Sequence, residues 1–118
     1  MSDALLIGEV AARTGLSADA LRYYEREGLL SPVLRDSAGR RQYDIDGLHL
    51  LDVLLCLRRT GMPIRGAREF ADLVRAGQTT VPQRVALLSQ HRAAVVEHIA
   101  ELQRDLIRID DKIARYTS

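Results

Sequence analysis

Arginine supplies nearly all of the positive charge in this chain, because only Lys112 is a lysine among the 17 basic residues. The planar fork of arginine donates two parallel hydrogen bonds, which suits phosphate oxygens and the edge of guanine. A GC-rich genome would produce the same bias, so the arginine content alone assigns no partner. Since the formal net charge is only +1, any basic surface that recognises an anion must be local.

The residue types that carry metal chemistry or catalysis are sparse. Cys56 is the single cysteine, whereas a metal sensor needs several thiolates and an iron–sulfur cluster about four. His91 and His98 lie about 10 Å apart along a helix, too far for one chain to clamp a metal with both. We find no paired carboxylates, nucleophile–base set or phosphate loop. The sequence therefore indicates no enzyme, no metal site and no cofactor.

Two short helices precede any other predicted element. Residues 7–14 form a helical pattern that Gly15 stops, and Ser17 is a good N-cap for a second helix over residues 18–27, which ends at Gly28. Two short helices joined by a tight, glycine-containing turn are the signature of a helix-turn-helix.

A small hairpin and two more helices follow. Residues 36–39 are turn formers between short flanks over residues 29–35 and 40–43, which predicts a wing. Asp44 or Asp46 can cap a third helix that runs to about Thr60. A fourth helix is expected from about residue 64 to 76. With few aromatic residues, the composition suits helices better than sheets.

The last segment is the most periodic part of the chain. From Pro82 to Tyr116 it has no glycine and no further proline, and its apolar residues recur at alternating spacings of three and four. This heptad seam, interrupted only by Arg92, predicts a long helix that packs against a partner. The apolar members of the seam are Val85, Leu88, Val95, Ile99, Leu102, Leu106, Ile109, Ile113 and Tyr116. The alternative is a helix that folds back on its own domain.

Six stretches, in order, resemble MerR-type transcription regulators: residues 7–11, 14–17, 21–25, 28–30, 40–44 and 57–64. The resemblance covers roughly residues 6–76. It implies a mainly α fold, with a winged helix-turn-helix over residues 1–77 and a dimerisation helix over residues 78–118 that forms an antiparallel coiled coil. It also implies a homodimer that bends and untwists promoter DNA, so that RNA polymerase can read two badly phased promoter elements.

The resemblance also assigns candidate contacts with DNA. The second helix would enter the major groove by its N-terminal end, with Ser17, Ala18 and Asp19 nearest the bases. Their side chains are poor base readers, so we expect contacts with the backbone and the shape of DNA to dominate. The remaining family-implied contacts are Arg22, Tyr23, Arg40, Arg41, Tyr43 and, with less certain placement, Arg65.

Two of these assignments have simpler structural alternatives. Tyr23 and Tyr24 can both belong to the core, although we expect Tyr24 to point inward and Tyr23 outward. Arg40 and Arg41 can be a solvated turn, although a preceding helix-turn-helix favours phosphate binding.

The stretch around Cys56 resembles a MerR subgroup of aldehyde and thiol-stress regulators, the AdhR/NmlR type, in which a lone cysteine at this place is the proposed sensor. Arg59 could share its helix face and stabilise a thiolate. A helix C-terminus opposes negative charge, however, and the apolar surroundings suggest a buried, inert thiol. A reactive sensor and a packed hydrophobe therefore both remain open.

Two other functions also remain open: a MerR regulator that responds to a small effector without thiol chemistry, and an effector-free protein that bends DNA. No segment approaches the roughly 20 apolar residues of a membrane span, and the N-terminus lacks the pattern of a signal peptide. We therefore expect a cytoplasmic protein whose partners are double-stranded promoter DNA, a second copy of itself and, indirectly, RNA polymerase.

Overall fold

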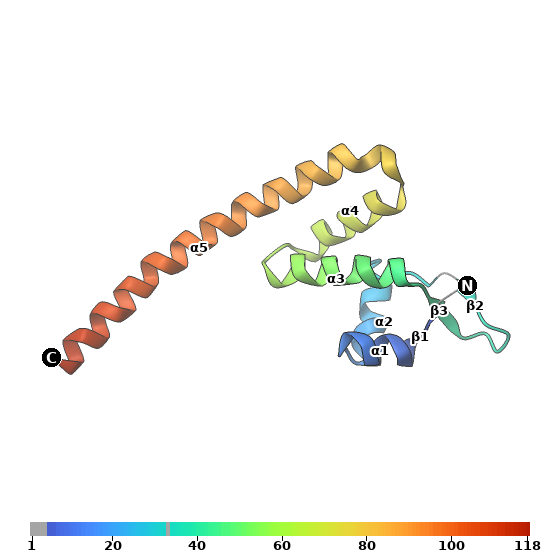
Figure 1. Ribbon diagram of the computed structural model, residues 1–118, viewed down its shortest axis with the longest axis horizontal. Helices are drawn as coiled ribbons and strands as arrows, with labels where there is room; N and C mark the ends of the chain where they lie inside the picture. Colours follow the sequence, from blue (N-terminus) through green and yellow to red (C-terminus); the bar gives the residue numbers. More distant parts are fainter. Residues whose placement is uncertain (1–4, 33) are drawn as a thin grey trace. The chain divides into compact units, whose positions relative to one another are not determined.

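The computed structural model describes residues 5–32 and 34–118, and the chain divides into two units at Val81 and Pro82. The mainly helical fold is confirmed (Figure 1). The elements, in chain order, are β1 (Leu5–Leu6), α1 (Ile7–Thr14), α2 (Ala18–Arg26), β2 (Leu34–Arg35), β3 (Arg41–Tyr43), α3 (Ile45–Arg59), α4 (Ile64–Arg75), the 3-10 helix η1 (Gln78–Thr80) and α5 (Val81–Thr117).

The helix-turn-helix forms as its local signals predict. Gly15 ends α1 in the left-handed region with φ of 75°, which glycine adopts without a steric penalty, and its N–H donates to the carbonyl of Ala11 at 2.9 Å. The hydroxyl oxygen of Ser17 then accepts from the N–H of Ala20 at 3.0 Å. This N-cap satisfies one of the free N–H groups at the start of α2. The turn and the cap together fix where α2 begins.

The wing is one side of a three-stranded antiparallel sheet with strand order β1-β3-β2. The predicted hairpin corresponds to β2 and β3, whereas β1 was not predicted. Leu5 and Leu6 pair with Tyr43 and Gln42, so β1 ties the beginning of the chain to the wing.

Asp36 holds the turn between β2 and β3. Its carboxylate accepts from the N–H groups of Ala38 at 2.9 Å and Arg40 at 2.8 Å. Its second oxygen accepts from the Nε of Arg40 at 2.8 Å. These bonds favour the charged carboxylate, with the backbone N–H of Arg40 the largest cause, and they lower the pKa of Asp36 below 3.8.

One apolar cluster joins the sheet to three helices. Its buried members are Leu5, Val10, Leu21, Leu30, Tyr43, Leu48 and Leu51. They come from β1, α1, α2, the segment after α2, β3 and α3. The apolar face of each short helix is therefore covered by the others, as the packing of small helical domains requires.

The helices α3 and α4 pack against each other (Figure 1). Asp44 caps α3, because its carboxylate accepts from the N–H of Gly47 at 2.8 Å. Buried side chains on the two helices and their connection include Leu54, Leu57, Met62, Ala67, Phe70 and Ala71. The guanidinium of Arg58 donates to the carbonyl of Met62 at 2.7 Å and so holds the connection closed.

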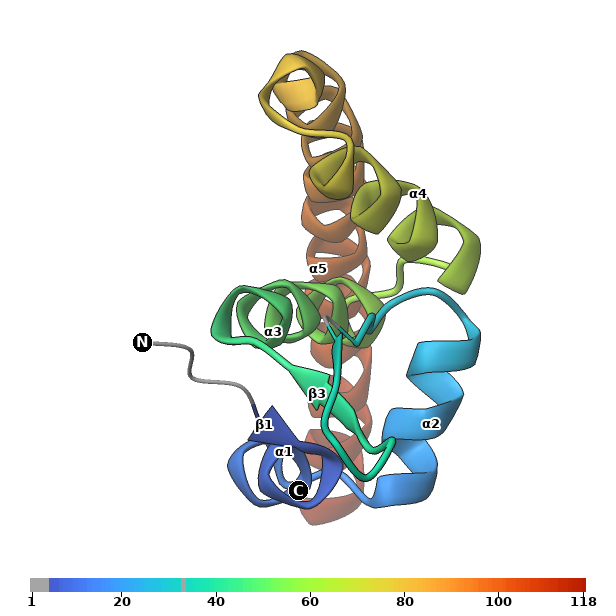
Figure 2. The same ribbon diagram turned by 90° about the vertical axis from the view of Figure 1, so that its right-hand side faces the viewer.

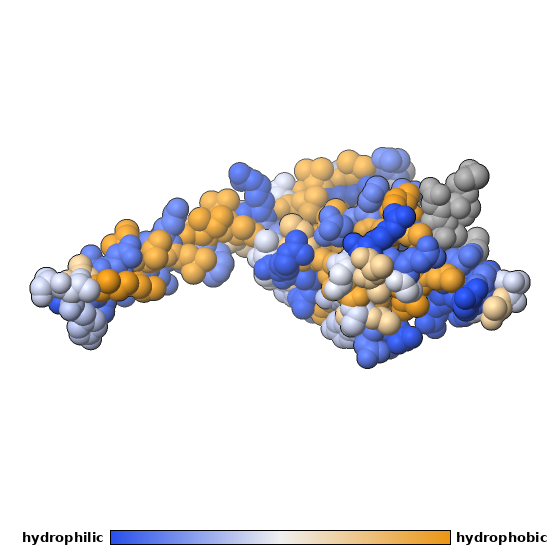
Figure 3. All heavy atoms as spheres, turned by 60° about the horizontal axis from the view of Figure 1, so that its bottom comes forward, coloured by the Kyte–Doolittle hydropathy of each residue, from blue (hydrophilic) through white to orange (hydrophobic). Residues whose placement is uncertain are grey.

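The second unit is formed by α5. Its 37 residues make a helix about 55 Å long, none of whose residues is buried. Figure 3 shows apolar side chains recurring along its surface. Neither α5 nor any other helix in residues 5–32 and 34–118 combines the length and apolarity needed to cross a membrane.

Candidate nucleic-acid interface

A hollow of about 270 Å³ in the first unit brings together four arginines. Arg22 comes from α2, Arg35 from β2, Arg41 from β3 and Arg40 from the turn between the strands. Figure 2 shows the wing running beside α2. Three of the four residues were predicted to contact DNA, and the structure places them around one concave surface.

Arg35 is the member of this group that sequence reasoning missed. It pairs with Arg41 across the two strands of the wing, and its guanidinium donates to the carbonyl of Gly39 at 2.9 Å. The hairpin register places Arg35 and Arg41 at directly opposed positions, so a register drawn from the turn would have found it.

The first turn of α2 carries the residues predicted to lie nearest the bases. Ser17 is engaged as the N-cap, and Ala18 is partly buried. Asp19 is 95% exposed and forms an ion pair with Arg22 at 3.1 Å. An exposed ion pair of this kind contributes about 1 kcal/mol or less, so Arg22 can exchange Asp19 for a phosphate at small cost.

The predicted division between the two tyrosines of α2 is confirmed. Tyr24 packs against the apolar cluster, whereas Tyr23 is 41% exposed. The two rings meet edge to face with centroids 5.5 Å apart. Tyr23 therefore presents its hydroxyl at the surface, and its contact with phosphate stays a prediction.

Tyr43, which was also predicted to contact DNA, is more buried than the arginines beside it. Its side chain is completely buried, and its hydroxyl donates to the carboxylate of Glu25 at 2.9 Å. Burial, followed by the hydrogen bond and negative charge of Glu25, raises the pKa of Tyr43 to about 12. Tyr43 also lines the arginine hollow, but its hydroxyl is engaged by Glu25, so its contact with phosphate stays a prediction.

Glu25 also binds Arg41, and sequence reasoning missed this residue as well. The Nε of Arg41 lies 3.2 Å from one carboxylate oxygen of Glu25. A terminal nitrogen of the same guanidinium lies 3.4 Å from the other oxygen. The recognition helix and the wing are thus joined by polar contacts at the edge of the arginine hollow.

Two arginines of α4 hold the C-terminal end of α2. Arg68 donates to the carbonyl of Glu27 at 2.8 Å and binds its carboxylate at 2.6 Å. Arg75 donates to the carbonyl of Gly28 at 2.6 Å. Cations at a helix C-terminus satisfy its free carbonyl groups and oppose its negative dipole. This α4–α2 clamp, formed by Arg68 and Arg75, fixes the C-terminal end of α2.

Arg65 lies apart from the arginine hollow. It is exposed in the first turn of α4 and lines a separate hollow with Arg68, Glu69, Asp72 and Leu73. The structure therefore does not bring Arg65 together with the other predicted contacts, and its role at a second wing stays a prediction.

Cys56 lies in the last turns of α3, and its side chain is exposed. The thiol is thus accessible in the single chain, whereas the alternative of a thiol packed against the partner's long helix stays a prediction. The hydroxyl of Thr60 donates to the carbonyl of Cys56 at 2.9 Å. Among residues 5–32 and 34–118, no three His, Cys, Asp or Glu side chains gather closely enough to hold a metal ion.

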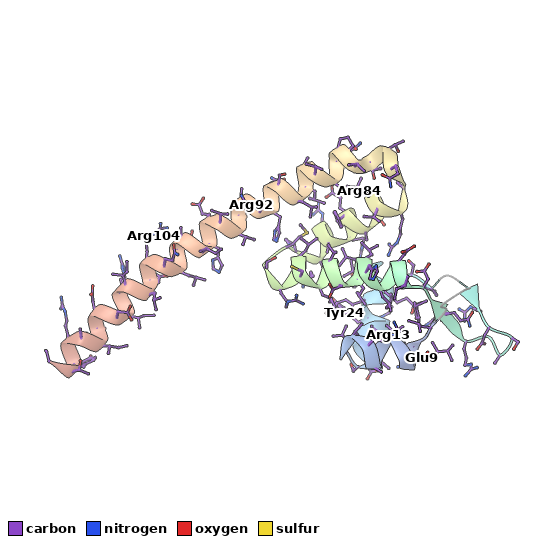
Figure 4. The ribbon with its side chains drawn as sticks, in the orientation of Figure 1. Glu9, Arg13, Tyr24, Arg84, Arg92 and Arg104 are labelled. Atoms are coloured by element: carbon purple, nitrogen blue, oxygen red, sulfur yellow. The ribbon has the colours of Figure 1, made fainter. Side chains whose placement is uncertain are left out.

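The predicted seam lies on one continuous helix, α5. More than half of the surface is exposed at four of its residues, Leu102, Leu106, Ile109 and Ile113. The C-terminal part of the seam is therefore not covered by the chain itself. Arg92, the one charged member of the heptad pattern, also lies on α5 (Figure 4).

Two family models match the chain in succession. The model described as the MerR family regulatory protein matches residues 6–43, and the model described as the MerR DNA-binding region matches residues 48–112. The first contains the helix-turn-helix and the wing, and the second contains α4 and most of α3 and α5.

Similar proteins and solved structures agree with these models. A helix-turn-helix transcriptional regulator of Haemophilus influenzae is 37% identical over 92% of this chain and 80% of its own length. The regulator AdhR of Bacillus subtilis is 37% identical over 77% of this chain and 65% of its own length.

Among solved structures, HiNmlR, described as a MerR family regulator that lacks the sensor domain and is bound to promoter DNA, superposes with a TM-score of 0.84. It is 35% identical, over 97% of this chain and 90% of that one. A MerR regulator of Listeria monocytogenes superposes with a TM-score of 0.87 at 34% identity, over 97% of this chain and 86% of that one. The chain belongs to the MerR family of DNA-binding transcription regulators.

Proposed function

We propose that this protein binds promoter DNA as a homodimer, with α2 in the major groove and the wing on neighbouring phosphates, and controls transcription by bending and untwisting the duplex. The observation that carries the proposal is the hollow lined by Arg22, Arg35, Arg40 and Arg41 between α2 and the wing. RNA polymerase is then an indirect partner, which reads the promoter in its altered shape.

Backbone contacts and DNA shape carry most of the recognition. The first turn of α2 offers a capping serine, a partly buried alanine and an exposed acid, whereas the arginines cluster beside it. Arginines suit phosphate oxygens, and phosphate contacts fix the register of a protein on the duplex. Specificity then arises from the energy needed to deform each sequence.

The seam on α5 supports a dimer. A heptad stripe of exposed leucine and isoleucine side chains needs an apolar partner, which a second α5 supplies in an antiparallel coiled coil. Under this proposal residues 1–77 bind DNA and residues 78–118 dimerise. The relative HiNmlR was solved on promoter DNA, which supports the same use of the shared fold here.

The DNA proposal is tested by selecting duplexes from a random-sequence pool with wild-type protein and measuring bending of an end-labelled selected duplex by energy transfer. We expect one enriched site with two-fold symmetry and a bend on binding. The Arg22→Ala variant should bind the selected duplex about tenfold more weakly with an unchanged melting temperature. Arg115→Ala, in the last turn of α5, is the charge-matched control. Unchanged binding by Arg22→Ala would contradict the interface.

We further propose that Cys56 senses reactive aldehydes. Its exposure gives a small carbonyl compound access to the sulfur. With formaldehyde, the sulfur forms a bond to the carbonyl carbon, the C=O double bond becomes single, and the thiol proton moves to the oxygen. The product is a hemithioacetal, and no oxidant is needed. Its added bulk on α3 would alter how this helix packs in the dimer.

The sensor is tested by in vitro transcription from a promoter that carries the selected duplex between its −35 and −10 elements. Wild-type protein should change transcript levels on addition of formaldehyde, whereas Cys56→Ser should bind the promoter equally well and not respond. A full response by Cys56→Ser would reject the sensor and favour a small effector bound elsewhere. No response by either protein would favour an effector-free DNA-bending protein.

A further inference from the structure

Glu25 is an acidic residue at a surface built from arginines. Its side chain is 15% exposed, and from α2 it contacts Arg41, which lines the arginine hollow, and Tyr43, which belongs to the apolar cluster. A negative charge beside DNA phosphates opposes binding by simple electrostatics. Its presence there calls for a role other than direct attraction of DNA.

The carboxylate of Glu25 makes three polar contacts, all of them to β3. One oxygen lies 3.2 Å from the Nε of Arg41. The other lies 3.4 Å from a terminal nitrogen of Arg41 and accepts from the hydroxyl of Tyr43 at 2.9 Å. Two nitrogens of one guanidinium therefore face two oxygens of one carboxylate, which is the arrangement that best fixes the direction of an arginine side chain.

Tyr43 anchors the carboxylate of Glu25 to the core by a hydrogen bond. Its ring is completely buried in the apolar cluster, and β3 is paired with strands on both sides. The hydroxyl of Tyr43 is protonated throughout the neutral range and donates to Glu25 at 2.9 Å. Contacts therefore run from the core through Tyr43 and Glu25 to Arg41. They hold the side chain of Arg41 so that its exposed guanidinium can meet DNA.

We propose that Glu25 is a positioning residue that sets the placement of Arg41, and with it the wing, relative to α2. This inference rests on the proposed function in DNA binding. A helix in the groove and a wing on the backbone can measure DNA shape only if the spacing between them is held. A preorganised pair loses less conformational freedom on binding, whereas a loose wing accepts many duplexes about equally well.

This role predicts opposite effects on two kinds of DNA. Glu25→Gln removes the negative charge, which favours any duplex, and loosens Arg41, which disfavours the correct one. Affinity for the duplex selected by wild-type protein should fall about tenfold, the worth of one charge-assisted hydrogen bond. Affinity for poly(dI·dC) should be equal or higher. A purely electrostatic role would raise both affinities alike, and a purely structural one would lower both together with the melting temperature.

Three further variants complete the experiment, with affinities measured by fluorescence anisotropy on the full-length protein. Glu97→Gln removes the same charge from an exposed position on α5 and should leave the ratio of the two affinities unchanged. Glu25→Asp keeps the charge but shortens the reach, so it should lower the ratio as Glu25→Gln does. In an Arg41→Gln background, Glu25→Gln should lower the ratio no further.

Each result decides the proposal. A ratio for Glu25→Gln equal to that for Glu97→Gln would overturn it, and so would a further tenfold loss in the Arg41→Gln background. If Glu25→Gln does not fold, Glu25→Asp decides alone, because a wild-type ratio in that variant would overturn the proposal. Failure of wild-type protein to select any duplex would instead overturn the proposed function itself.

Discussion

Arg40 and Arg41 of the wing each pair with a carboxylate of their own chain, and under the proposed function each also meets a phosphate of DNA. Arg40 is 65% exposed on its side chain and pairs with Asp36, and Arg41 pairs with Glu25. In both pairs the guanidinium is exposed, whereas the carboxylates of Asp36 and Glu25 are only 16% and 15% exposed. A guanidinium has five N–H donors, so each arginine can bind a phosphate while it keeps its carboxylate partner, and it then releases a counterion from the DNA.

Replacing Arg40 and Arg41 with Gln should flatten the salt dependence of DNA binding. If both contact phosphate, the slope of log affinity against log salt concentration should fall in magnitude by up to about 2 per protomer. Titrations of the selected duplex at several salt concentrations measure this slope. The control replaces Arg104 and Arg108, two exposed arginines of α5, with Gln (Arg104 is labelled in Figure 4). Equal slopes for the two double variants would exclude phosphate contacts by the wing.

Tyr43 makes stability depend on pH in the alkaline range. Its pKa is raised from 10.0 to about 12, so the folded state holds the hydroxyl proton more tightly than the unfolded state does. The resulting stabilisation is complete below pH 10 and is lost as pH rises from 10 through about 12.

Tyr43→Phe should remove this pH dependence. At pH 7 the variant should lose about 1 kcal/mol of unfolding free energy, because it lacks the hydrogen bond to Glu25. Between pH 10 and 12 the wild-type protein should lose about 1–2 kcal/mol relative to the variant, with partial solvation of the hydroxyl taken into account. Urea unfolding followed by circular dichroism measures the difference, and parallel curves for the two proteins would contradict the assignment.

Single residues differ in how far sequence alone could place them. Tyr24 and Tyr23 follow from helical periodicity, because adjacent positions on a helix point about 100° apart. Tyr43 was assigned to DNA only through the family resemblance; strand alternation places it on the same face of β3 as Arg41, and the structure buries it there against Glu25. Glu25 could not be assigned, since its partners lie 16 and 18 residues away and meet it only when the wing folds back on α2.

At the scale of elements, local sequence signals predicted the helices, whereas nothing in the sequence indicated the long-range contacts between them. Gly15, Ser17 and Asp44 fix helix ends through bonds within four residues of themselves, so their roles can be read from the sequence. The strand β1 has only two residues, too few to show a period. The α4–α2 clamp joins residues 41 and 47 positions apart, so only the folded chain reveals it.

Breaking the α4–α2 clamp should loosen the end of α2. In the variant with both Arg68→Ala and Arg75→Ala, the carbonyls of Glu27 and Gly28 lose their cationic donors, at a cost of about 2 kcal/mol. Hydrogen exchange should quicken at the amides of Glu27, Gly28 and Leu29, which bond to the last turn of α2.

The matched control for the clamp is Arg65→Ala, which changes an exposed arginine of the same helix. Exchange at the three amides should stay at the wild-type rate in this control. Equal exchange in the control and in the double variant would show that the clamp does not hold α2.

At the scale of the whole molecule, α5 is the element whose apolar side chains are least covered by the rest of its own chain. Its heptad pattern could be predicted from the sequence because the spacing of three and four persists across the helix. The pattern does not fix how strongly two copies of α5 pair, because Arg92 occupies a seam position where it cannot pack as leucine does. Pairing must then depend on the uninterrupted stretch from Val95 to Ile113, whose last four apolar members are exposed.

Leu106→Glu should separate the dimer, because it places a carboxylate in the middle of that stretch, where pairing would bury it against apolar side chains. Sedimentation at micromolar concentration should show a monomer, whereas Gln90→Glu, which adds the same charge at an exposed position off the seam, should remain dimeric. The first unit does not depend on this position, so its melting transition should persist. A monomer offers one arginine hollow instead of two, so the salt slope of binding to the selected duplex should fall by about half. A dimeric Leu106→Glu variant would show that the copies associate through another surface.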